Sequence, residues 1–171
     1  MQVQEFSLFP SKVMQIDVSD VVSDADSQEI VLTIDDLITN HPASLSNDSS
    51  IKIQSKTFLF DDQAPLVFQK LKKTFLKSCE IYLKDNLDYY QYASTRAWFF
   101  KSDKTLNQPI SWHDHYPALL SGVFYVKSQG IGTMFDNPIS TAIDKSPSVI
   151  EPSDLSWVIF PSALKHSHNH L

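Results

Sequence analysis

The fold is decided by the stretch from Ser111 to Lys127, which reads Ser-Trp-His-Asp-His-Tyr-Pro-Ala-Leu-Leu-Ser-Gly-Val-Phe-Tyr-Val-Lys. Its first half places two imidazoles, His113 and His115, on either side of a single residue. In an extended segment, residues i and i+2 point to the same face, so both rings can reach one ion. Its second half, Leu120 to Val126, is rich in β-branched and aromatic residues and predicts a buried strand. The stretch therefore predicts an extended segment with two metal ligands, followed by a strand of the core.

A third imidazole, His166, lies near the other end of the chain, after the apolar run Trp157 to Phe160 and the turn Pro161-Ser162. Histidine is the commonest metal ligand in proteins. Two histidines from one strand and one from a distant strand form a facial set that leaves positions open for substrate or oxygen. We therefore predict that His113, His115 and His166 hold one metal ion.

Other interpretations of these residues stay open on the sequence alone. A histidine in a strand is commonly a core or surface residue without a metal. Asp114 is an alternative third ligand, although its side chain is expected to leave the face that His113 and His115 share. His168 and His170 alternate with polar residues after His166, and we interpret them as a polar tail.

Length and composition favour one globular domain that spans residues 1–171. The sequence is 42% hydrophobic and 12% aromatic, which is typical of a well-packed protein. Its formal net charge is −6 and its only arginine is Arg96, whereas nucleic-acid binding needs clustered Lys and Arg to neutralise phosphates. We therefore expect no nucleic-acid partner.

Cysteine usage and hydropathy bear on the compartment. The single cysteine, Cys79, excludes an internal disulfide and a cysteine-based zinc or iron–sulfur site within one chain. No apolar run approaches the ~20 residues of a membrane span. The N-terminus lacks the basic start and apolar core of a signal peptide. We expect a cytoplasmic protein with no membrane partner.

The N-terminal part, residues 1–88, is predicted to hold the helices. Before them, Val13 to Val18 alternates apolar and polar residues and predicts a half-buried strand. Ser27 to Ile38 predicts a short amphipathic helix capped by Asp26 or by Ser27 itself. The Ser-, Asn- and Asp-rich stretch from Asn40 to Ser50 predicts a surface loop.

A second helix is predicted to begin near Ala64-Pro65, with Asp61 or Asp62 as its cap. Its lysines are expected to form a solvated outer face, and Cys79 is interpreted as a buried small hydrophobe. The apolar residues recur every three or four positions and share one face: Phe68, Leu71, Phe75, Cys79 and Tyr82.

The remainder, residues 89–171, is predicted to form a β core. The expected strands are Tyr90 to Lys101, Ile110 to His115, Leu120 to Lys127, Thr133 to Phe135, a short one around Val149, Leu155 to Phe160 and Leu164 to His168. Helices followed by short strands predict an α+β domain with a mainly antiparallel sandwich or barrel.

Four motifs in sequence order, together with the opening of the chain, resemble the phage and marine-bacterial branch of the 2-oxoglutarate/Fe(II)-dependent oxygenase superfamily. They are Trp98 with His113-x-His115, Leu-Leu-Ser-Gly-Val-Phe-Tyr-Val (119–126), Gly-x-x-Phe-x-x-Pro (132–138), Ile-Phe-Pro-Ser-Ala-Leu-x-His (159–166), and the opening Phe-Ser-Leu-Phe-Pro (6–10) followed by 13–18. The resemblance reaches both ends of the chain and is densest from Trp98 to His166. It implies a double-stranded β-helix, or jelly roll, with N-terminal helices packed on one sheet.

The same resemblance implies a chemistry. Fe(II) would be held by His113, His115 and His166, and 2-oxoglutarate would chelate it through its 1-carboxylate and 2-oxo group. Oxygen would take the remaining position, and a C–H bond of an unidentified small-molecule or peptide substrate would be hydroxylated. The superfamily typically has an Asp or Glu at the position of His115, so the implied site has three histidines and one more positive charge than usual.

The far carboxylate of 2-oxoglutarate needs a cationic or hydroxyl partner. Family members usually supply an Arg on the strand beyond the distal His, and the sequence contains none after His166. Ser121, Tyr125 and Lys127 share one face of their predicted strand and could bind the co-substrate instead. The alternative is that Tyr125 is a core residue and Lys127 a solvated residue at the strand end.

Three classes of function follow. The first is an Fe(II)/2-oxoglutarate oxygenase. The second is a metal-binding jelly roll or three-histidine dioxygenase that does not use 2-oxoglutarate, and the third is a truncated, inactive homologue that serves as a binding module. Because the sequence ends at Leu171, we expect the last strand of the jelly roll to be missing. Its neighbour would then have an unpaired edge, through which the chain self-associates, or the C-terminus would be loosely held.

Overall fold

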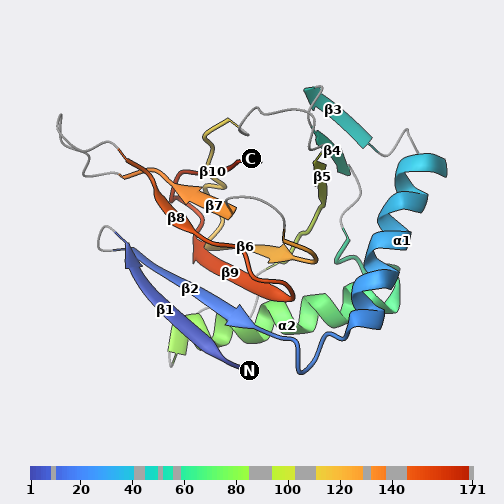
Figure 1. Ribbon diagram of the computed structural model, residues 1–171, viewed down its shortest axis with the longest axis horizontal. Helices are drawn as coiled ribbons and strands as arrows, with labels where there is room; N and C mark the ends of the chain where they lie inside the picture. The colour runs from blue at the N-terminus through green and yellow to red at the C-terminus, as the bar shows by residue number, and fades with distance from the viewer. Residues whose placement is uncertain are drawn as a thin grey trace. The chain divides into compact units, whose positions relative to one another are not determined.

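The computed structural model describes the chain in nine ranges: 1–8, 11–40, 45–49, 52–55, 59–84, 94–102, 111–128, 132–137 and 146–169. Within them it contains helices and antiparallel sheets and is therefore an α+β protein, as predicted, and it does not close into a barrel (Figure 1). The described residues fall into two compact units: Met1–Asp20 with Asn107–Leu171, and Val21–Leu106. Neither of the two helices, which both lie in the second unit, is long and apolar enough to cross a membrane.

The first unit contains a four-stranded antiparallel sheet. Its strands in spatial order are β1 (Val3–Leu8), β2 (Ser11–Asp17), β9 (Ser156–Pro161) and β6 (Leu120–Tyr125). The inner strand β9 carries the apolar run predicted from the sequence, and residues 156–160 are all buried. A strand paired on both sides and buried on both faces reads as a continuous hydrophobic run, which explains why β9 shows no alternation.

The second sheet of this unit contains three strands in the order β10 (His166–Asn169), β7 (Gly132–Phe135) and β8 (Ser148–Ile150). An isolated bridge between His113 and His166 adds the 111–115 segment to the free side of β10. From 113 to 166 the chain forms three nested antiparallel pairs, with β7–β8 inside β6–β9 and the His113–His166 bridge outermost. The middle pair belongs to the first sheet and the other two to the second.

The two sheets enclose one hydrophobic core. The first sheet contributes Val13, Val158 and Phe160, and the second contributes Phe135 and Ile150, all of them buried. The rings of Phe135 and Phe160 meet edge to face with centroids 5.0 Å apart. Each such side chain contributes roughly 1.5–3 kcal/mol on burial. This packing fixes β9 against β7 and thereby fixes the turn that leads from β9 to β10.

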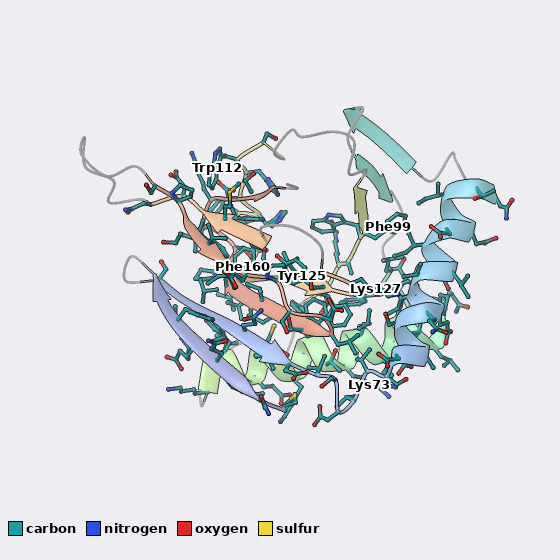
Figure 2. The ribbon with its side chains drawn as sticks, in the orientation of Figure 1. Lys73, Phe99, Trp112, Tyr125, Lys127 and Phe160 are labelled. Carbon is teal, nitrogen blue, oxygen red and sulfur yellow. The ribbon has the colours of Figure 1, made fainter. Side chains whose placement is uncertain are left out.

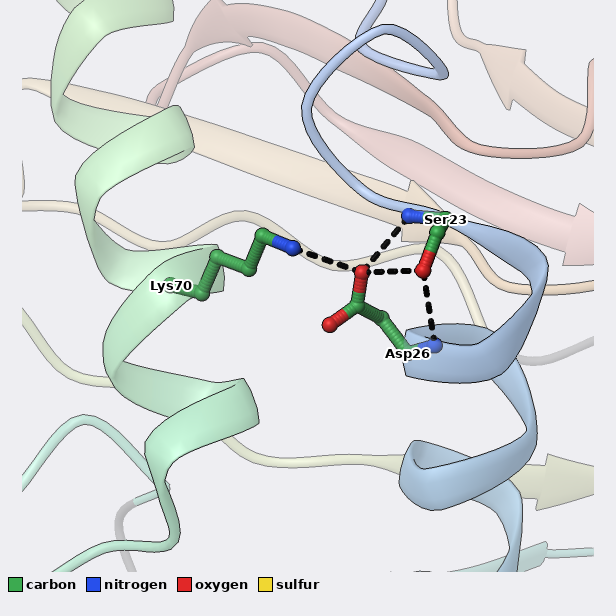
Figure 3. A network of polar contacts seen from close by, with 3 residues as sticks. All are labelled: Ser23, Asp26 and Lys70. Atoms are coloured by element: carbon green, nitrogen blue, oxygen red, sulfur yellow. Dashed lines mark hydrogen bonds and ion pairs between the residues drawn. The ribbon is translucent and has the colours of Figure 1, made fainter.

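The second unit contains helices α1 (Asp24–Asn40) and α2 (Leu66–Leu83) and the sheet β3 (Leu45–Ser49), β4 (Lys52–Ser55), β5 (Phe100–Ser102). Helix α1 begins with a reciprocal cap. The Asp26 amide donates to the Ser23 hydroxyl at 3.2 Å, and the Ser23 amide donates to the Asp26 carboxylate at 2.7 Å. Lys70 of α2 donates to the same carboxylate at 2.6 Å and ties the two helices together (Figure 3).

Both helices confirm the predictions, but both predicted caps are wrong. The cap of α1 is Ser23, because its hydroxyl reaches the first turn, whereas Asp26 already lies inside the helix. The residue before α2 is Pro65, which makes no side-chain cap hydrogen bond. The most buried residues of α2 are Val67, Phe68, Leu71, Thr74 and Ser78, so its buried face is rotated from the predicted one.

Cys79 is half-buried in α2 rather than fully buried. Burial nevertheless raises the pKa of its thiol to about 12. The two buried hydroxyls of the same helix donate to backbone carbonyls, Thr74 to Leu71 and Ser78 to Thr74. A hydroxyl satisfied inside its own helix can be buried at little cost, which explains why polar residues replace part of the predicted apolar stripe.

Several strand predictions need correction. The predicted surface loop at 40–50 contains β3, and the helical N-terminal part contains β1 to β4 as well as both helices. Of the predicted strand at 90–101, residues 94–99 are irregular and β5 begins only at Phe100, while 90–93 lie outside the described residues. The single-domain prediction for residues 1–171 stays a prediction.

Candidate metal centre

The three histidines are positioned by backbone pairing between two segments far apart in sequence. The His113 amide donates to the His166 carbonyl at 3.1 Å, and the His166 amide donates to the His113 carbonyl at 2.9 Å. Two residues further on, the His115 amide donates to the Ser162 carbonyl at 2.8 Å. The 111–115 segment is therefore held against both β10 and the turn that precedes it.

The 111–115 segment is not the strand that the sequence predicted at 110–115, because it pairs with β10 only through the bridge at His113, but this pairing still brings the three rings together. The ring centroids lie 5.1 Å apart for His113 and His115, 4.4 Å for His113 and His166, and 5.0 Å for His115 and His166. One nitrogen from each ring can be chosen so that all three lie within 4.8 Å of one another. Donor atoms around a single ion bound at ~2.1 Å lie roughly 3 to 4 Å apart, so small ring rotations bring these nitrogens to one metal.

Hydrogen bonds orient two of the rings for ligation. The Nδ1 atom of His113 lies 2.8 Å from the Ser111 carbonyl, and the Nδ1 atom of His166 lies 3.0 Å from the Leu164 carbonyl. A carbonyl oxygen can only accept, so each Nδ1 carries the hydrogen. The lone pair of each neutral ring is consequently on Nε2, the atom that is left for a metal.

Burial favours the neutral form, which a metal requires, for His115 and His166. His166 is only 1% exposed, and desolvation lowers its pKa to about 4. Desolvation, followed by the proximity of His113, also lowers the pKa of His115. Phe160 contributes to this environment, since its ring centroid lies 4.7 Å from that of His166. A histidine with a low pKa does not have to lose a proton at neutral pH before it binds a metal.

The structure also places the alternative ligands. Asp114 is exposed, and its carboxylate accepts the Tyr116 amide at 3.2 Å, so it lies outside the three-histidine group. His168 belongs to the backbone of β10, whereas its side chain, like all of His170, lies outside the described residues.

The residues predicted to bind 2-oxoglutarate have other contacts. The Ser121 hydroxyl lies 2.7 Å from the Ser162 hydroxyl. The Tyr125 hydroxyl lies 2.5 Å from that of Thr133, and burial raises the pKa of Tyr125 to about 12. Lys127 is exposed just beyond the end of β6 (Figure 2). Tyr125 packs against the core between the sheets, which agrees with the alternative interpretation made from the sequence.

Ser162 is a site residue that the sequence prediction used only as part of a turn. It is fully buried, its carbonyl accepts the His115 amide, and its hydroxyl contacts that of Ser121 in β6. The signal available in the sequence was a serine inside an otherwise apolar block, Ile159 to Leu164.

Comparison with known proteins leaves the family of this chain open. No protein-family model matches it, and no curated protein matches it. Three imidazoles close enough to hold one metal ion are therefore the feature from which its function has to be argued.

Proposed function

We propose that the protein is a non-haem iron oxygenase built on a jelly roll, in which His113, His115 and His166 hold Fe(II). One observation carries this proposal. Two of the three imidazoles are oriented by backbone carbonyls so that Nε2 is available, and nitrogens of all three lie within 4.8 Å. A structural zinc site is less well matched, because such sites are four-coordinate and closed, whereas three described ligands leave coordination positions open.

The jelly-roll assignment is supported by the nesting of the strand pairs. A jelly roll arises when one long antiparallel hairpin folds over so that successive pairs alternate between two facing sheets. The His113–His166 bridge, β6–β9 and β7–β8 follow this alternation, and side chains of both sheets fill the space between them. The histidines lie on the outermost pair, which is the open end of such a hairpin.

Three neutral imidazoles suit Fe(II) and would place it at the junction of the 111–115 segment with β10. When bound, Fe(II) would supply open coordination positions for oxygen and for a chelating co-substrate. The protein's own contribution is to hold the rings of His113 and His166 in one tautomer and to keep His166 away from water. The contacts of His166 with Phe160 and Phe135 exclude water, and the resulting desolvation lowers its pKa.

We further propose that the co-substrate is 2-oxoglutarate, as the resemblance implies. Lys127 is the cationic candidate for its far carboxylate, with the hydroxyls of Ser121 and Tyr125 as neutral candidates. The sole arginine, Arg96, belongs to the other unit. Lys127→Met tests this role, because it removes the charge and keeps most of the side-chain length.

A three-histidine dioxygenase that does not use 2-oxoglutarate is the second candidate. It is favoured by the contacts of Ser121 and Tyr125, whose hydroxyls are already paired with Ser162 and Thr133. A metal-binding module without catalysis is the third class.

Anaerobic addition of Fe(II) and then 2-oxoglutarate separates these classes. Chelation of the co-substrate by the metal predicts a visible charge-transfer band, followed by iron-dependent formation of succinate when oxygen is admitted. Iron binding without either signal supports the second or third class. Absence of Fe(II) binding by the folded wild-type protein contradicts the proposal.

A further inference from the structure

The turn from β9 to β10 contacts the chain between His115 and Ser121 at three positions, all through Ser162. Ser162 accepts the His115 amide on its carbonyl at 2.8 Å and donates its own amide to the Leu119 carbonyl at 3.1 Å. Its hydroxyl lies 2.7 Å from that of Ser121. The fully buried Ser162 thus contacts His115, Leu119 and Ser121.

His115 depends on this residue more than the other two histidines do. His113 and His166 exchange two backbone hydrogen bonds with each other, which fixes both. Toward the β9–β10 turn, the His115 backbone is held by the bond of its amide to Ser162, and its own carbonyl accepts the Ala118 amide within the loop. The position of Ser162 therefore constrains the backbone that carries the third ring.

We propose that Ser121 and Ser162 form a positioning pair for His115, so that the hydroxyl contact between them sets the geometry and affinity of the metal centre. The inference rests on the proposed metal site. It gives Ser121 the role of supporting the metal ligand His115 instead of binding 2-oxoglutarate. Ser121 is anchored in β6, opposite Phe160 of β9. The hydroxyl pair extends that register beyond the end of β9 and stops the turn from moving away from His115. Groups that hold a metal ligand in place typically change metal affinity about 10- to 100-fold when they are removed.

The test is an anaerobic Co(II) titration of the full chain, followed by visible absorption, for Ser162→Ala, Ser121→Ala and the double variant. Each single variant is expected to bind Co(II) about tenfold more weakly and to show an altered ligand-field spectrum. Because the two hydroxyls act as one pair, the double variant should be no weaker than the single ones. Ser121→Thr, which keeps a hydroxyl at a half-buried position, should restore the affinity.

Ser156→Ala is the matched control. Ser156 is fully buried like Ser162, but it lies at the opposite end of β9 from the turn, and its hydroxyl donates to the Ser153 carbonyl. It should leave Co(II) affinity unchanged, whatever it does to stability. Equal Co(II) affinity in wild type, Ser121→Ala and Ser162→Ala overturns the inference, and so does an equal loss in Ser156→Ala.

Two further outcomes separate this inference from the function on which it rests. Loss of 2-oxoglutarate affinity in Ser121→Ala with unchanged Co(II) affinity would make Ser121 a co-substrate ligand and overturn the positioning role alone. Failure of the folded wild-type protein to bind Co(II) would overturn the metal site itself, and the positioning role with it.

Discussion

The contact between α1 and α2 in the second unit permits a quantitative prediction. Asp26 accepts hydrogen bonds from Lys70 and from Ser23, and these bonds, with that of Lys70 first, lower its pKa from 3.8 to about 2 (Figure 3). A shift of this size corresponds to roughly 2.5 kcal/mol at most. The Lys70 side chain is 37% exposed, so solvent screening reduces the expected contribution of the pair to about 1 kcal/mol.

The perturbation is Lys70→Met, which removes the charge and keeps the apolar stem. A carboxyl group with a lowered pKa stabilises the folded state above its unfolded pKa and loses that contribution as the pH falls through its folded pKa. The variant should therefore be less stable than wild type by about 1 kcal/mol at neutral pH, and the difference should shrink as the pH falls from 3.8 toward about 2.

Urea unfolding measured across this pH range is the assay, with Lys73→Met as the control. Lys73 is an exposed lysine of the same helix, so its replacement should change stability little at any pH. Equal effects of the two substitutions at neutral pH would refute the reasoning. A Lys70→Met effect that does not depend on pH would refute it as well, because the lost contact would then not involve the ionised carboxylate.

Three further predictions concern packing and reactivity. Tyr125→Phe removes the contact between the Tyr125 and Thr133 hydroxyls and should lower the free energy of unfolding by about 1–2 kcal/mol, and in the same denaturation assay the double variant with Thr133→Val should lose less than the sum of the two single losses. Gly132→Ala should destabilise by at least ~1 kcal/mol, because Gly132 has φ +95° and the new Cβ would clash with the Ile150 carbonyl; unchanged thermal unfolding would contradict this. The Cys79 thiol, whose pKa is about 12, should react slowly with a thiol reagent near neutral pH and rapidly after unfolding, and fast stoichiometric labelling of the native protein would disprove its protection.

The sequence predicted those parts of the fold in which side chains alternate, repeat or form a continuous apolar run. The separation of His113 and His115 by one residue predicted a shared face, and the structure brings both rings to His166. The apolar run of β9 and the three- and four-residue spacing in α2 also predicted their elements correctly. In β9 and α2 burial enforces the pattern, so it can be read without knowledge of the packing partner.

Elements defined by backbone pairing alone were harder to predict. Strand β3 (Leu45–Ser49) is polar and was interpreted as a loop, because its pairing with β4 leaves no hydrophobic signature in the sequence. The cap of α1 was misplaced although Ser23-x-x-Asp26 is a recognisable capping pattern. The role of Ser162 depends on the positions of the His115 amide and the Leu119 carbonyl. Both are distant from Ser162 in the sequence, so no local pattern predicts these contacts.

The central claim is that His113, His115 and His166 bind one metal ion, and anaerobic Co(II) titration of histidine variants tests it most directly. Wild type should bind one equivalent, and His113→Ala and His166→Ala should each bind at least about tenfold more weakly, since each loses one ligand. His168→Ala is the control and should bind like wild type. Affinity that is unchanged in both His113→Ala and His166→Ala would contradict the claim.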